Sequence, residues 1–331
     1  MAHYDFVSIG DITTDAFIEL EDVRVDCDSN NENCRLSMNF GDKIPYKSVT
    51  EVRAVGNSPN AAVAAHRLGL ATALISDIGD DRGGQDCLDQ LRTEGLSTEF
   101  VKVHQGKITN YHYVLRYQAE RTILIKHEEY PYALPSFSEA PGWLYLSSMG
   151  PSSLPFHDEI AAFLDVNPDT KLAFQPGTFQ MEMGKERMAK MYAHAELTIC
   201  NKEESQRILG SASDDITELL VGMHALGSRQ VVITDGPNGG YASDGTHAWA
   251  IPMYPDPAPP VDRTGAGDAT ASTTAAYLAH GLSLPEALKR GMVNSMSVVQ
   301  HIGAQEGLLS AEQIDDYLAK APADFAATPL A

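Results

Sequence analysis

Residues 261–268, Val-Asp-Arg-Thr-Gly-Ala-Gly-Asp, have the composition of an anion-binding helix start. Gly265 and Gly267, on either side of Ala266, let the backbone N–H groups of a helix N-terminus approach a ligand closely, and the helix dipole there favours negative charge. Asp268 then stands in the first helical turn, where a carboxylate could take a proton from an attacking hydroxyl. The same pattern is also an ordinary helix start, so spacing alone leaves the functional and the structural interpretation equally open.

The other common phosphate-binding loops are absent from the sequence. No G-x-x-x-x-G-K-[ST] motif occurs, and the first strand-to-helix turn, Gly10-Asp-Ile-Thr-Thr-Asp15, lacks the G-x-G-x-x-G pattern. These absences disfavour a P-loop NTPase and a standard dinucleotide-binding fold. A phosphate-binding site of a third kind is required.

Short apolar segments alternate with turns and helical segments along the chain. Most of the expected strands are continuous apolar runs, which is typical of strands buried on both faces of a parallel sheet. We therefore expect an α/β fold with a central, mostly parallel sheet flanked by helices on both faces. The expected strands are Phe6–Ile9, Thr72–Ile78, Trp143–Leu146, Lys171–Phe174, Leu197–Cys200 and Val231–Thr234.

Two segments, at about 16–55 and 108–127, interrupt this order. The first is polar and turn-rich with alternating pieces such as Ser48–Val55, whereas Ile108–Lys126 alternates around a turn at Gln118–Glu120, as a β-hairpin does. Together they predict a small β-sheet inserted into a single domain that spans residues 1–331. Such an insertion is a lid over the α/β core, a dimerisation surface, or both.

Helix signals are clear towards the C-terminus. The helix that follows Gly267 should run to Gly281, which suits the position after a helix end, and its small side chains allow close packing. Ser283-Leu-Pro-Glu286 has a capping-box pattern with proline in the first turn, and it predicts a second helix that stops at Gly303.

Composition excludes several classes of protein. With 331 residues, 43% of them hydrophobic, the chain can bury a sizeable core. A net charge of −21 disfavours binding to nucleic acids or anionic membranes. The charge is uneven, because residues 1–50 carry ten acidic and four basic side chains while residues 225–303 carry six and four. The acidic N-terminal part favours an uncharged polyhydroxy ligand over a phosphorylated one.

The N-terminal sequence and the cysteines predict the cellular compartment. The sequence begins without the basic and apolar regions of a signal peptide and contains no long apolar run, so we expect a cytoplasmic protein. Four cysteines are too few for a disulfide framework, and Cys27 and Cys34 are more widely spaced than usual metal ligands. Reduced thiols are expected.

Five motifs occur along the chain, at residues 55–60, 78–81, 201–204, 234–239 and 262–268. In their types and order they resemble those of the ribokinase-like carbohydrate and nucleoside kinases, also called the phosphofructokinase-B family. Residues 262–268 (D-R-T-G-A-G-D) resemble its D-T-x-G-A-G-D signature, and residues 55–60 (V-G-N-S-P-N) resemble G-G-x-x-x-N. Residues 201–204 match N-x-x-E, residues 234–239 match T-x-G-x-x-G, and residues 78–81 contain a structural G-D-D turn. The resemblance covers nearly the whole chain and implies the ribokinase-like fold.

The resemblance implies roles for the residues that match. Asp268 would be the general base that deprotonates the acceptor hydroxyl, while the N–H groups of Gly265, Ala266 and Gly267 would stabilise the transferring γ-phosphoryl group of ATP. Asn201 would contact the nucleotide phosphates, and Glu204 would hold Mg²⁺ through water. Without the resemblance, Asn201 and Glu204 would be interpreted as a helix N-cap with an exposed glutamate.

A nucleotide site and a cation site are also implied. Thr234, Gly236 and Gly239 would line the nucleotide, on a turn that is equally typical of a hairpin, and Asn294 matches a residue near the adenine. Several family members hold a monovalent cation beside the anion-binding loop, so K⁺ is suggested at Asp262 and the main chain of residues 303–305.

For the phosphoryl acceptor, the turn at residues 10–15 resembles the segment whose acidic residue binds sugar hydroxyls. Carboxylates suit this task because each can accept hydrogen bonds from two hydroxyls. We rank Asp15 first, then Gly56 and Asn60, and then Asp11. As an alternative, Asp11 and Asp15 are plain turn and cap residues.

Three residues depart from the family pattern. Val55 replaces the first glycine of the G-G pair, where it would narrow the acceptor pocket, and Asn57 occupies the next variable position. Arg263 stands where threonine is common, and it could meet an ATP phosphate or a phosphorylated acceptor. None of these changes removes a catalytic residue.

The sequence thus predicts an ATP-dependent phosphotransferase that acts on a hydroxymethyl group of a sugar. The main alternative is an adenosine-like nucleoside kinase, because Tyr111, Tyr113 and Tyr117 could stack on a base, unless they face a dimer partner. A catalytically silent sugar- or nucleotide-binding regulator is a third interpretation, against which the retention of Asp268 argues. Expected partners are ATP, a small-molecule acceptor and a second copy bound through the small sheet, with neither nucleic acid nor membrane.

Overall fold

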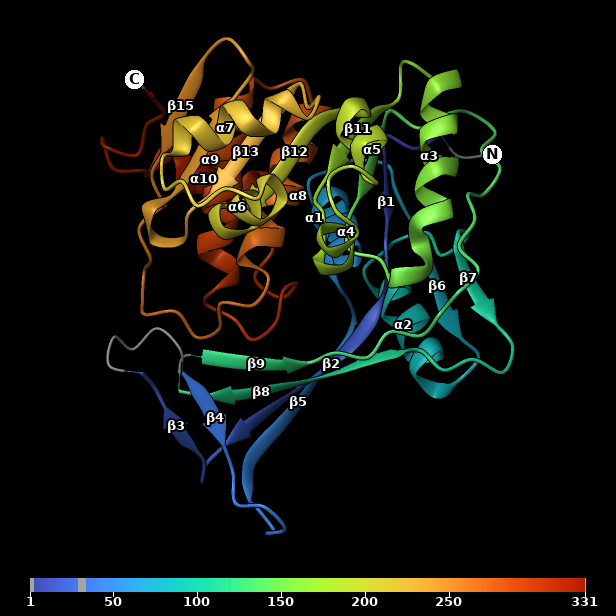
Figure 1. Ribbon diagram of the computed structural model, residues 1–331, viewed down its shortest axis with the longest axis vertical. Helices are drawn as coiled ribbons and strands as arrows, with labels where there is room; N and C mark the ends of the chain where they lie inside the picture. Colours follow the sequence, from blue (N-terminus) through green and yellow to red (C-terminus); the bar gives the residue numbers. More distant parts are fainter. Residues whose placement is uncertain (1–2, 29–33, 119, 331) are drawn as a thin grey trace.

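The computed structural model describes residues 3–28, 34–118 and 120–330, and its largest element is a sheet that lies between two layers of helices (Figure 1). Among the described residues this sheet has ten strands. In spatial order they are β16 (Thr328–Pro329), β15 (Ala248–Ile251), β14 (Gly240–Ser243), β13 (Gln230–Thr234), β12 (Ala195–Asn201), β11 (Lys171–Phe174), β10 (Trp143–Leu146), β1 (Phe6–Ile9), β6 (Thr72–Gly79) and β7 (Val101–His104). The strands from β13 to β7 are parallel, and β14, β15 and β16 add antiparallel pairs at one edge.

Both faces of the sheet are buried, which explains the continuous apolar runs. Along β1, Phe6 packs into one core while its neighbour Val7 packs into the other, and Tyr145 and Leu144 of β10 divide in the same way. The predicted α/β fold is therefore confirmed.

The helices cover the two faces in two groups. One group comprises α1 (Asn57–Arg67), α8 (Ala266–Ala279), α9 (Leu284–Val298) and α10 (Ala311–Ala319). The other comprises α3 (Leu154–Val166), α4 (Thr178–Met183), α5 (Ala189–His194), α6 (Lys202–Leu209) and α7 (Ile216–Ala225). A separate cluster joins α2 (Arg82–Thr93) to β6, and the short 3-10 helices are η1 (Pro151–Ser153) and η2 (Gly236–Asn238).

A small sheet extends from one side of this core (Figure 1). Its strands, in spatial order, are β5 (Tyr46–Val55), β2 (Thr13–Leu20), β8 (Asn110–Tyr117) and β9 (Glu120–Leu124). A two-stranded ribbon of β3 (Arg24–Asp26) and β4 (Arg35–Ser37) continues beyond it. The hairpin expected within residues 108–126 is present as β8 and β9; Gln118 in its turn has a φ of 56°, and Ala119 lies outside the described residues.

Two details of the C-terminal helices differ from the sequence prediction. Helix α9 ends at Val298 and does not continue to Gly303, because the chain turns there to place the N–H of Gly303 3.1 Å from the carboxylate of Asp262. The predicted capping box is also wrong, since the Ser283 side chain makes no capping hydrogen bond.

The expectation that all cysteines are reduced is wrong for one pair. Cys27 and Cys34 form a disulfide, because pairing of Asp26 with Arg35 in the β3–β4 ribbon places the next residues of the two strands opposite each other. Cys87 and Cys200 are buried free thiols. No helix within the described residues is both long and apolar enough to cross a membrane.

Candidate active site

A cavity of about 440 Å³ lies between the N-terminus of α8, the carboxyl ends of β12 and β13, and one face of the small sheet. The carboxyl ends of parallel strands are the usual place for a ligand in an open α/β sheet. Ten of the residues singled out in the sequence line this cavity: Asp11, Asp15, Gly56, Asn60, Asn201, Glu204, Thr234, Gly265, Gly267 and Asp268.

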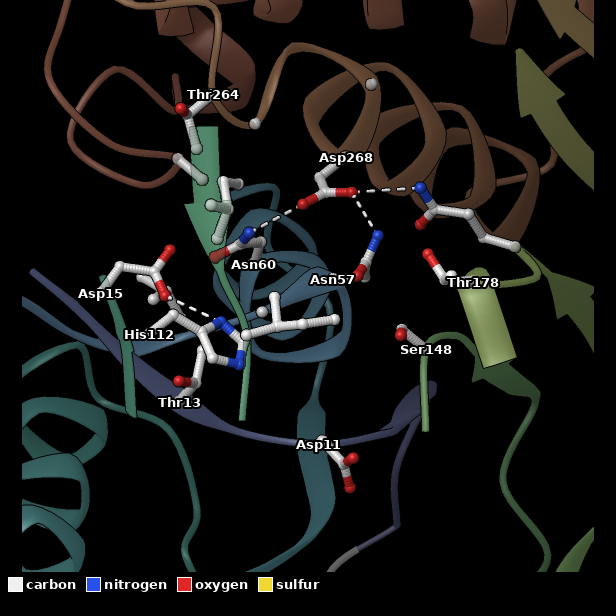
Figure 2. Close-up of a pocket in the computed structure, with 18 of the residues that line it drawn as sticks. Asp11, Thr13, Asp15, Asn57, Asn60, His112, Ser148, Thr178, Thr264 and Asp268 are labelled. Atoms are coloured by element: carbon white, nitrogen blue, oxygen red, sulfur yellow. Dashed lines mark hydrogen bonds and ion pairs between the residues drawn. The ribbon is translucent and has the colours of Figure 1, made fainter. Parts of the chain in front are cut away.

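The carboxylate of Asp268 is held by three side-chain amides. Asn57 and Gln175 donate to Oδ1 over 2.8 and 3.1 Å, and Asn60 donates to Oδ2 over 2.9 Å. Figure 2 shows Asn57 and Asn60 pointing at Asp268 from below. Since a carboxylate can accept about four hydrogen bonds, one position on Oδ2 stays available for a hydroxyl donor.

Two carboxyl groups of the cavity are shifted towards weaker acidity. Burial raises the pKa of Asp268 above its ordinary value, and the charge of Asp15 acts in the same direction, whereas the amide donors oppose both. Burial also raises the pKa of Glu204, helped by the negative charge of Asp268. A carboxylate whose pKa is raised in this way is a stronger base, as the removal of a hydroxyl proton requires.

The glycine loop before α8 has the geometry of an anion site. Gly265 adopts a left-handed conformation with φ of 83°, and a Cβ there would lie only 2.3 Å from that of Ala304. Gly267 faces open space inside the cavity. Ala266 does not line the cavity, and its N–H points to the carbonyl oxygen of Arg263 at 3.5 Å. Of the three residues in this loop, Gly265 and Gly267 therefore line the cavity and Ala266 does not.

Asp262 is buried beneath this loop and organises it. Its Oδ1 accepts hydrogen bonds from the backbone N–H and the hydroxyl of Thr264, and its Oδ2 accepts one from the N–H of Gly303. Its two carboxylate oxygens thereby tie Thr264 to Gly303.

Asn201 and Glu204 form a reciprocal cap at the start of α6. The Asn201 side chain accepts from the N–H of Glu204, and Glu204 Oε2 accepts from the N–H of Asn201, both over 2.8 Å. The predicted helix N-cap is thus present. Glu204, however, is partly buried and lines the cavity instead of pointing to solvent.

The predicted acceptor residues lie at the end of the cavity next to the small sheet. Asp11 accepts hydrogen bonds from Tyr132 and His127, each over 2.9 Å. Asp15 lies 3.3 Å from Nδ1 of His112. Both carboxylates are therefore paired with a histidine that the sequence analysis did not single out.

Not every residue that was predicted to bind the nucleotide lies at the cavity. Thr234 lines it, whereas Gly236 and Gly239 lie in the adjacent β13–β14 turn. Asn294 is fully buried, and its side chain donates to Thr273 and accepts from the N–H of Leu309. Its amide therefore joins α8, α9 and the chain before α10.

Several lining residues were missed by sequence reasoning. Gln175 directly follows the expected strand Lys171–Phe174, so its position at a strand end was an available signal. His112, Arg121 and His127 lie in or beside the hairpin, and only the pairing of β8 with β2 reveals which of its side chains face the cavity. Val55, Asn57 and Arg263, noted as departures from the family pattern, also line it.

The aromatic residues proposed to stack on a base face elsewhere. Tyr111 and Tyr113 lie on the opposite side of β8 from His112; Tyr111 donates to Glu51, and Tyr113 is about half exposed. None of Tyr111, Tyr113 and Tyr117 lines the cavity. The apolar groups that do so from the small sheet and α4 include Phe17, Ile123 and Phe179.

One contact joins the small sheet directly to the glycine loop. Arg116 of β8 donates to the carbonyl oxygen of Val261 over 3.0 Å, one residue before Asp262. The small sheet is thereby tied to the segment that leads into α8.

Comparison with known proteins gives relatives over most of the chain. The chain is 24% identical over 282 residues to an ATP-dependent 6-phosphofructokinase of Thermoanaerobacterium thermosaccharolyticum, which covers 81% of this chain and 85% of the relative. The structure of Arabidopsis thaliana ribokinase, complexed with ribose and ATP, superposes with a TM-score of 0.79 at 19% identity, over 96% of this chain and 99% of that one. A nucleoside kinase of Methanocaldococcus jannaschii superposes with a TM-score of 0.78 at 16% identity, over 96% and 100%.

The model of the pfkB family of carbohydrate kinases matches residues 20–311. This match spans the glycine loop, the Asn201–Glu204 cap and most of the small sheet. The chain belongs to the pfkB family of carbohydrate kinases.

Proposed function

We propose that this protein transfers the γ-phosphoryl group of ATP to a hydroxymethyl group of a sugar. The observation that carries the proposal is the position of Asp268: a partly buried carboxylate in the first turn of α8, beside a glycine loop and in one cavity with Asp15. Membership of a family of carbohydrate kinases supports it.

In the proposed reaction, Asp268 Oδ2 takes the proton of the acceptor hydroxyl as its oxygen attacks the γ-phosphorus. The bond between that phosphorus and the β–γ bridging oxygen breaks, and ADP leaves with the bonding electrons. N–H groups beside Gly267 and the positive end of the α8 dipole face the developing negative charge. The protein's main contribution is thus positioning and electrostatic stabilisation.

The cavity fits a hydrated Mg²⁺ carried with the nucleotide. The described residues contain no group of three or more side chains arranged as a closed metal site, but Glu204 and Asp268 place two carboxylates in one cavity. Mg²⁺ commonly binds one or two carboxylates together with waters and substrate phosphates, and it neutralises phosphate charge. Glu204 would hold it through water. We also propose K⁺ at Asp262 and the main chain of residues 303–305, since the Asp262 carboxylate is buried beside Gly303.

A nucleoside is the second candidate acceptor. The tyrosines of β8 do not support it, but Phe17, Ile123 and Phe179 give the acceptor end apolar surfaces that a base could contact. A nucleoside kinase is also among the structures that share this fold. Arg121 and Arg263 line the cavity as well, so a phosphorylated sugar belongs in the same panel.

The decisive experiment measures ADP release from Mg-ATP with pentoses, hexoses, sugar phosphates and nucleosides. A sugar should give the highest kcat/KM. Highest activity with a nucleoside would favour the second candidate. Saturable ligand binding without turnover of any acceptor would instead identify a silent regulator.

Assembly and location complete the proposal. Val49, Tyr113 and Leu124 expose apolar side chains on the face of the small sheet away from the cavity, which supports a homodimer through that face. ATP, the proposed phosphoryl donor, is made and used inside cells, which supports a cytoplasmic location.

A further inference from the structure

Gln305 is buried next to Asn60 and does not line the cavity. Its side-chain Nε2 donates two hydrogen bonds, one to Oδ1 of Asn60 over 3.0 Å and one to the carbonyl oxygen of Ala54 over 2.8 Å. Asn60 in turn donates from Nδ2 to Oδ2 of Asp268, a contact that is drawn in Figure 2. A continuous series of hydrogen bonds therefore leads from the main chain at Ala54 to the carboxylate of Asp268.

The chemistry of the amides fixes the direction of this series. A backbone carbonyl oxygen can only accept, so the end of Gln305 that faces Ala54 must be its NH2 group, whose second hydrogen points to Asn60. Asn60 must then present its oxygen to Gln305 and its own NH2 group to Asp268. The donor that faces Asp268 is thus set from the main chain, independently of the charge on the carboxylate.

The carbonyl group that starts the series belongs to a strained residue. Ala54 is buried near the end of β5 and has a φ of 56°, a left-handed conformation that alanine rarely adopts. Such a conformation costs free energy and persists only where the surrounding structure holds it. The hydrogen bond from Gln305 is one of the contacts that hold it.

The segment that carries Gln305 is clamped to the same helix as Asn60. Arg67 of α1 donates from Nη1 to the carbonyl oxygens of Gln305 and Leu308, over 2.8 and 2.9 Å, and is itself paired with Glu94 at 2.9 Å. Asn60 and Arg67 are seven residues apart, so they lie on the same face of α1. The side chain of Gln305 therefore has a fixed origin relative to Asn60.

Resting on the proposed kinase function, we propose that Gln305 is a positioning residue for the general base. It holds the amide of Asn60 with the NH2 group towards Asp268, both before and after the carboxylate takes the proton of the acceptor hydroxyl. Without Gln305, only the charge of Asp268 orients that amide, and this charge disappears when the proton is transferred. A donor that does not reorganise during the reaction is what electrostatic preorganisation requires.

A double-mutant cycle tests this role. Gln305→Met removes the donor and keeps an unbranched side chain of similar length, while Asn60→Ala removes the amide that Gln305 orients. Gln300→Met is the matched control, because Gln300 also donates from Nε2 to a main-chain carbonyl, that of Ala258 over 3.1 Å, but lies outside the cavity lining. Melting curves establish that each variant is folded. If Gln305→Met does not fold, Gln305→Leu, which also lacks the donor, takes its place in every measurement.

ADP release is measured at saturating Mg-ATP with the best acceptor among pentoses, hexoses, sugar phosphates and nucleosides. We expect Gln305→Met to lower kcat/KM for the acceptor about tenfold, as the loss of one buried hydrogen bond predicts, with ATP affinity within twofold of wild type. In the Asn60→Ala background the same substitution should change kcat/KM less than twofold, because no amide remains to be oriented. Gln300→Met should match its parent in both backgrounds.

The side-chain amide signals of Asn60 give a second readout that does not depend on turnover. In protein labelled with 15N-asparagine, these nuclear magnetic resonance signals are the ones that Asn60→Ala removes. Gln305→Met should shift them, because the amide loses the partner of its oxygen, whereas Gln300→Met should leave them in place.

The outcomes separate this inference from the proposed function. An equal loss of kcat/KM in both backgrounds would show that Gln305 acts through Ala54 or through the fold, and would overturn the inference. Wild-type kcat/KM in Gln305→Met, or signals of Asn60 that do not move, would overturn it as well. If the wild-type protein releases ADP with none of the acceptors, the kinase proposal is refuted instead, and the signals of Asn60 alone decide whether Gln305 holds the amide.

Discussion

The carboxylate of Asp268 is subject to two opposing electrostatic effects. Burial and the charge of Asp15 favour its protonated form, while three amide donors favour the ionised form. Gln175 is held in the donating orientation because its Oε1 accepts a hydrogen bond from the fully buried Tyr145. The basicity of this residue is therefore set by neighbours from separate parts of the chain: β2, α1, β10 and the residue after β11.

Replacement of Asp268 by asparagine should abolish the base but preserve the shape of the site. We expect kcat to fall about 10²–10⁴-fold, the range for loss of a general base, with ATP affinity within a few-fold of wild type. Steady-state ADP release and nucleotide titration measure the two quantities. An active Asp268→Asn variant would show that the base is misassigned.

Replacement of Gln175 by methionine should change the pH dependence of the reaction. Loss of one donor to Asp268 raises the pKa of that carboxyl further, so the active, ionised form is lost at a higher pH as the solution is acidified. The acidic limb of the kcat/KM profile should move up by about one pH unit, equivalent to about 1.4 kcal/mol. Tyr145→Phe should give a smaller shift in the same direction, and a downward shift in either variant would contradict this account.

At the scale of elements, two glycines at the N-terminus of α8 meet different requirements. The backbone conformation requires Gly265, whereas open space in the cavity is kept by Gly267. Gly265 needs its left-handed conformation and lies against Ala304, whereas a Cβ on Gly267 would meet no atom within 4 Å and would project into the cavity. Two neighbouring glycines of one motif thus serve different purposes.

The substitutions Gly265→Ala and Gly267→Ala should therefore give opposite results. Gly265→Ala should destabilise the fold by about 1–3 kcal/mol, seen as a lower melting temperature, because both the φ angle and the space are unfavourable. Gly267→Ala should melt like the wild type but bind ATP more weakly, because its methyl group lies where the phosphates approach. Equal melting temperatures for both variants would contradict the assignment.

The β3–β4 ribbon is an element with no side chain in the cavity lining among the described residues. We expect dithiothreitol, or the double substitution of Cys27 and Cys34 by serine, to leave kcat and both KM values within twofold. Activity assays with and without reductant measure this. A larger change would mean that the ribbon acts on the cavity.

At the scale of the whole molecule, the small sheet has one face towards the cavity and one apolar face towards solvent. The cavity lies on one face of the sheet and the proposed dimer interface on the other. The two can therefore share the sheet without sharing side chains.

Charge on the outer face should prevent the proposed dimer. Val49→Asp combined with Leu124→Asp should convert a dimer into a monomer in size-exclusion chromatography with light scattering. Val221→Asp is the control, since Val221 is equally exposed but lies on α7. A wild-type protein that is monomeric at all concentrations would refute the dimer.

The sequence predicted those features that depend on local pattern. The buried parallel strands appear as apolar runs, and the helix predicted after Gly267 up to Gly281 is present as α8 (Ala266–Ala279). Asn57 and Gln175 converge on Asp268 only because α1, β11 and α8 pack together, and no local pattern contains that information. The Cys27–Cys34 disulfide likewise depends on the register of a short ribbon whose strands are three residues each.

For the proposed kinase, the hydrogen bond from Arg116 to the carbonyl of Val261 predicts thermodynamic linkage between acceptor and nucleotide. We expect an acceptor that stabilises the position of β8 to stabilise also the segment before α8, where we propose that the phosphates bind, because the two share this contact. Linkage is reciprocal, so the factor by which the acceptor raises the affinity for ATP equals the factor by which ATP raises the affinity for the acceptor. Loss of the guanidinium would weaken that mutual dependence even where each ligand, taken alone, still binds as before.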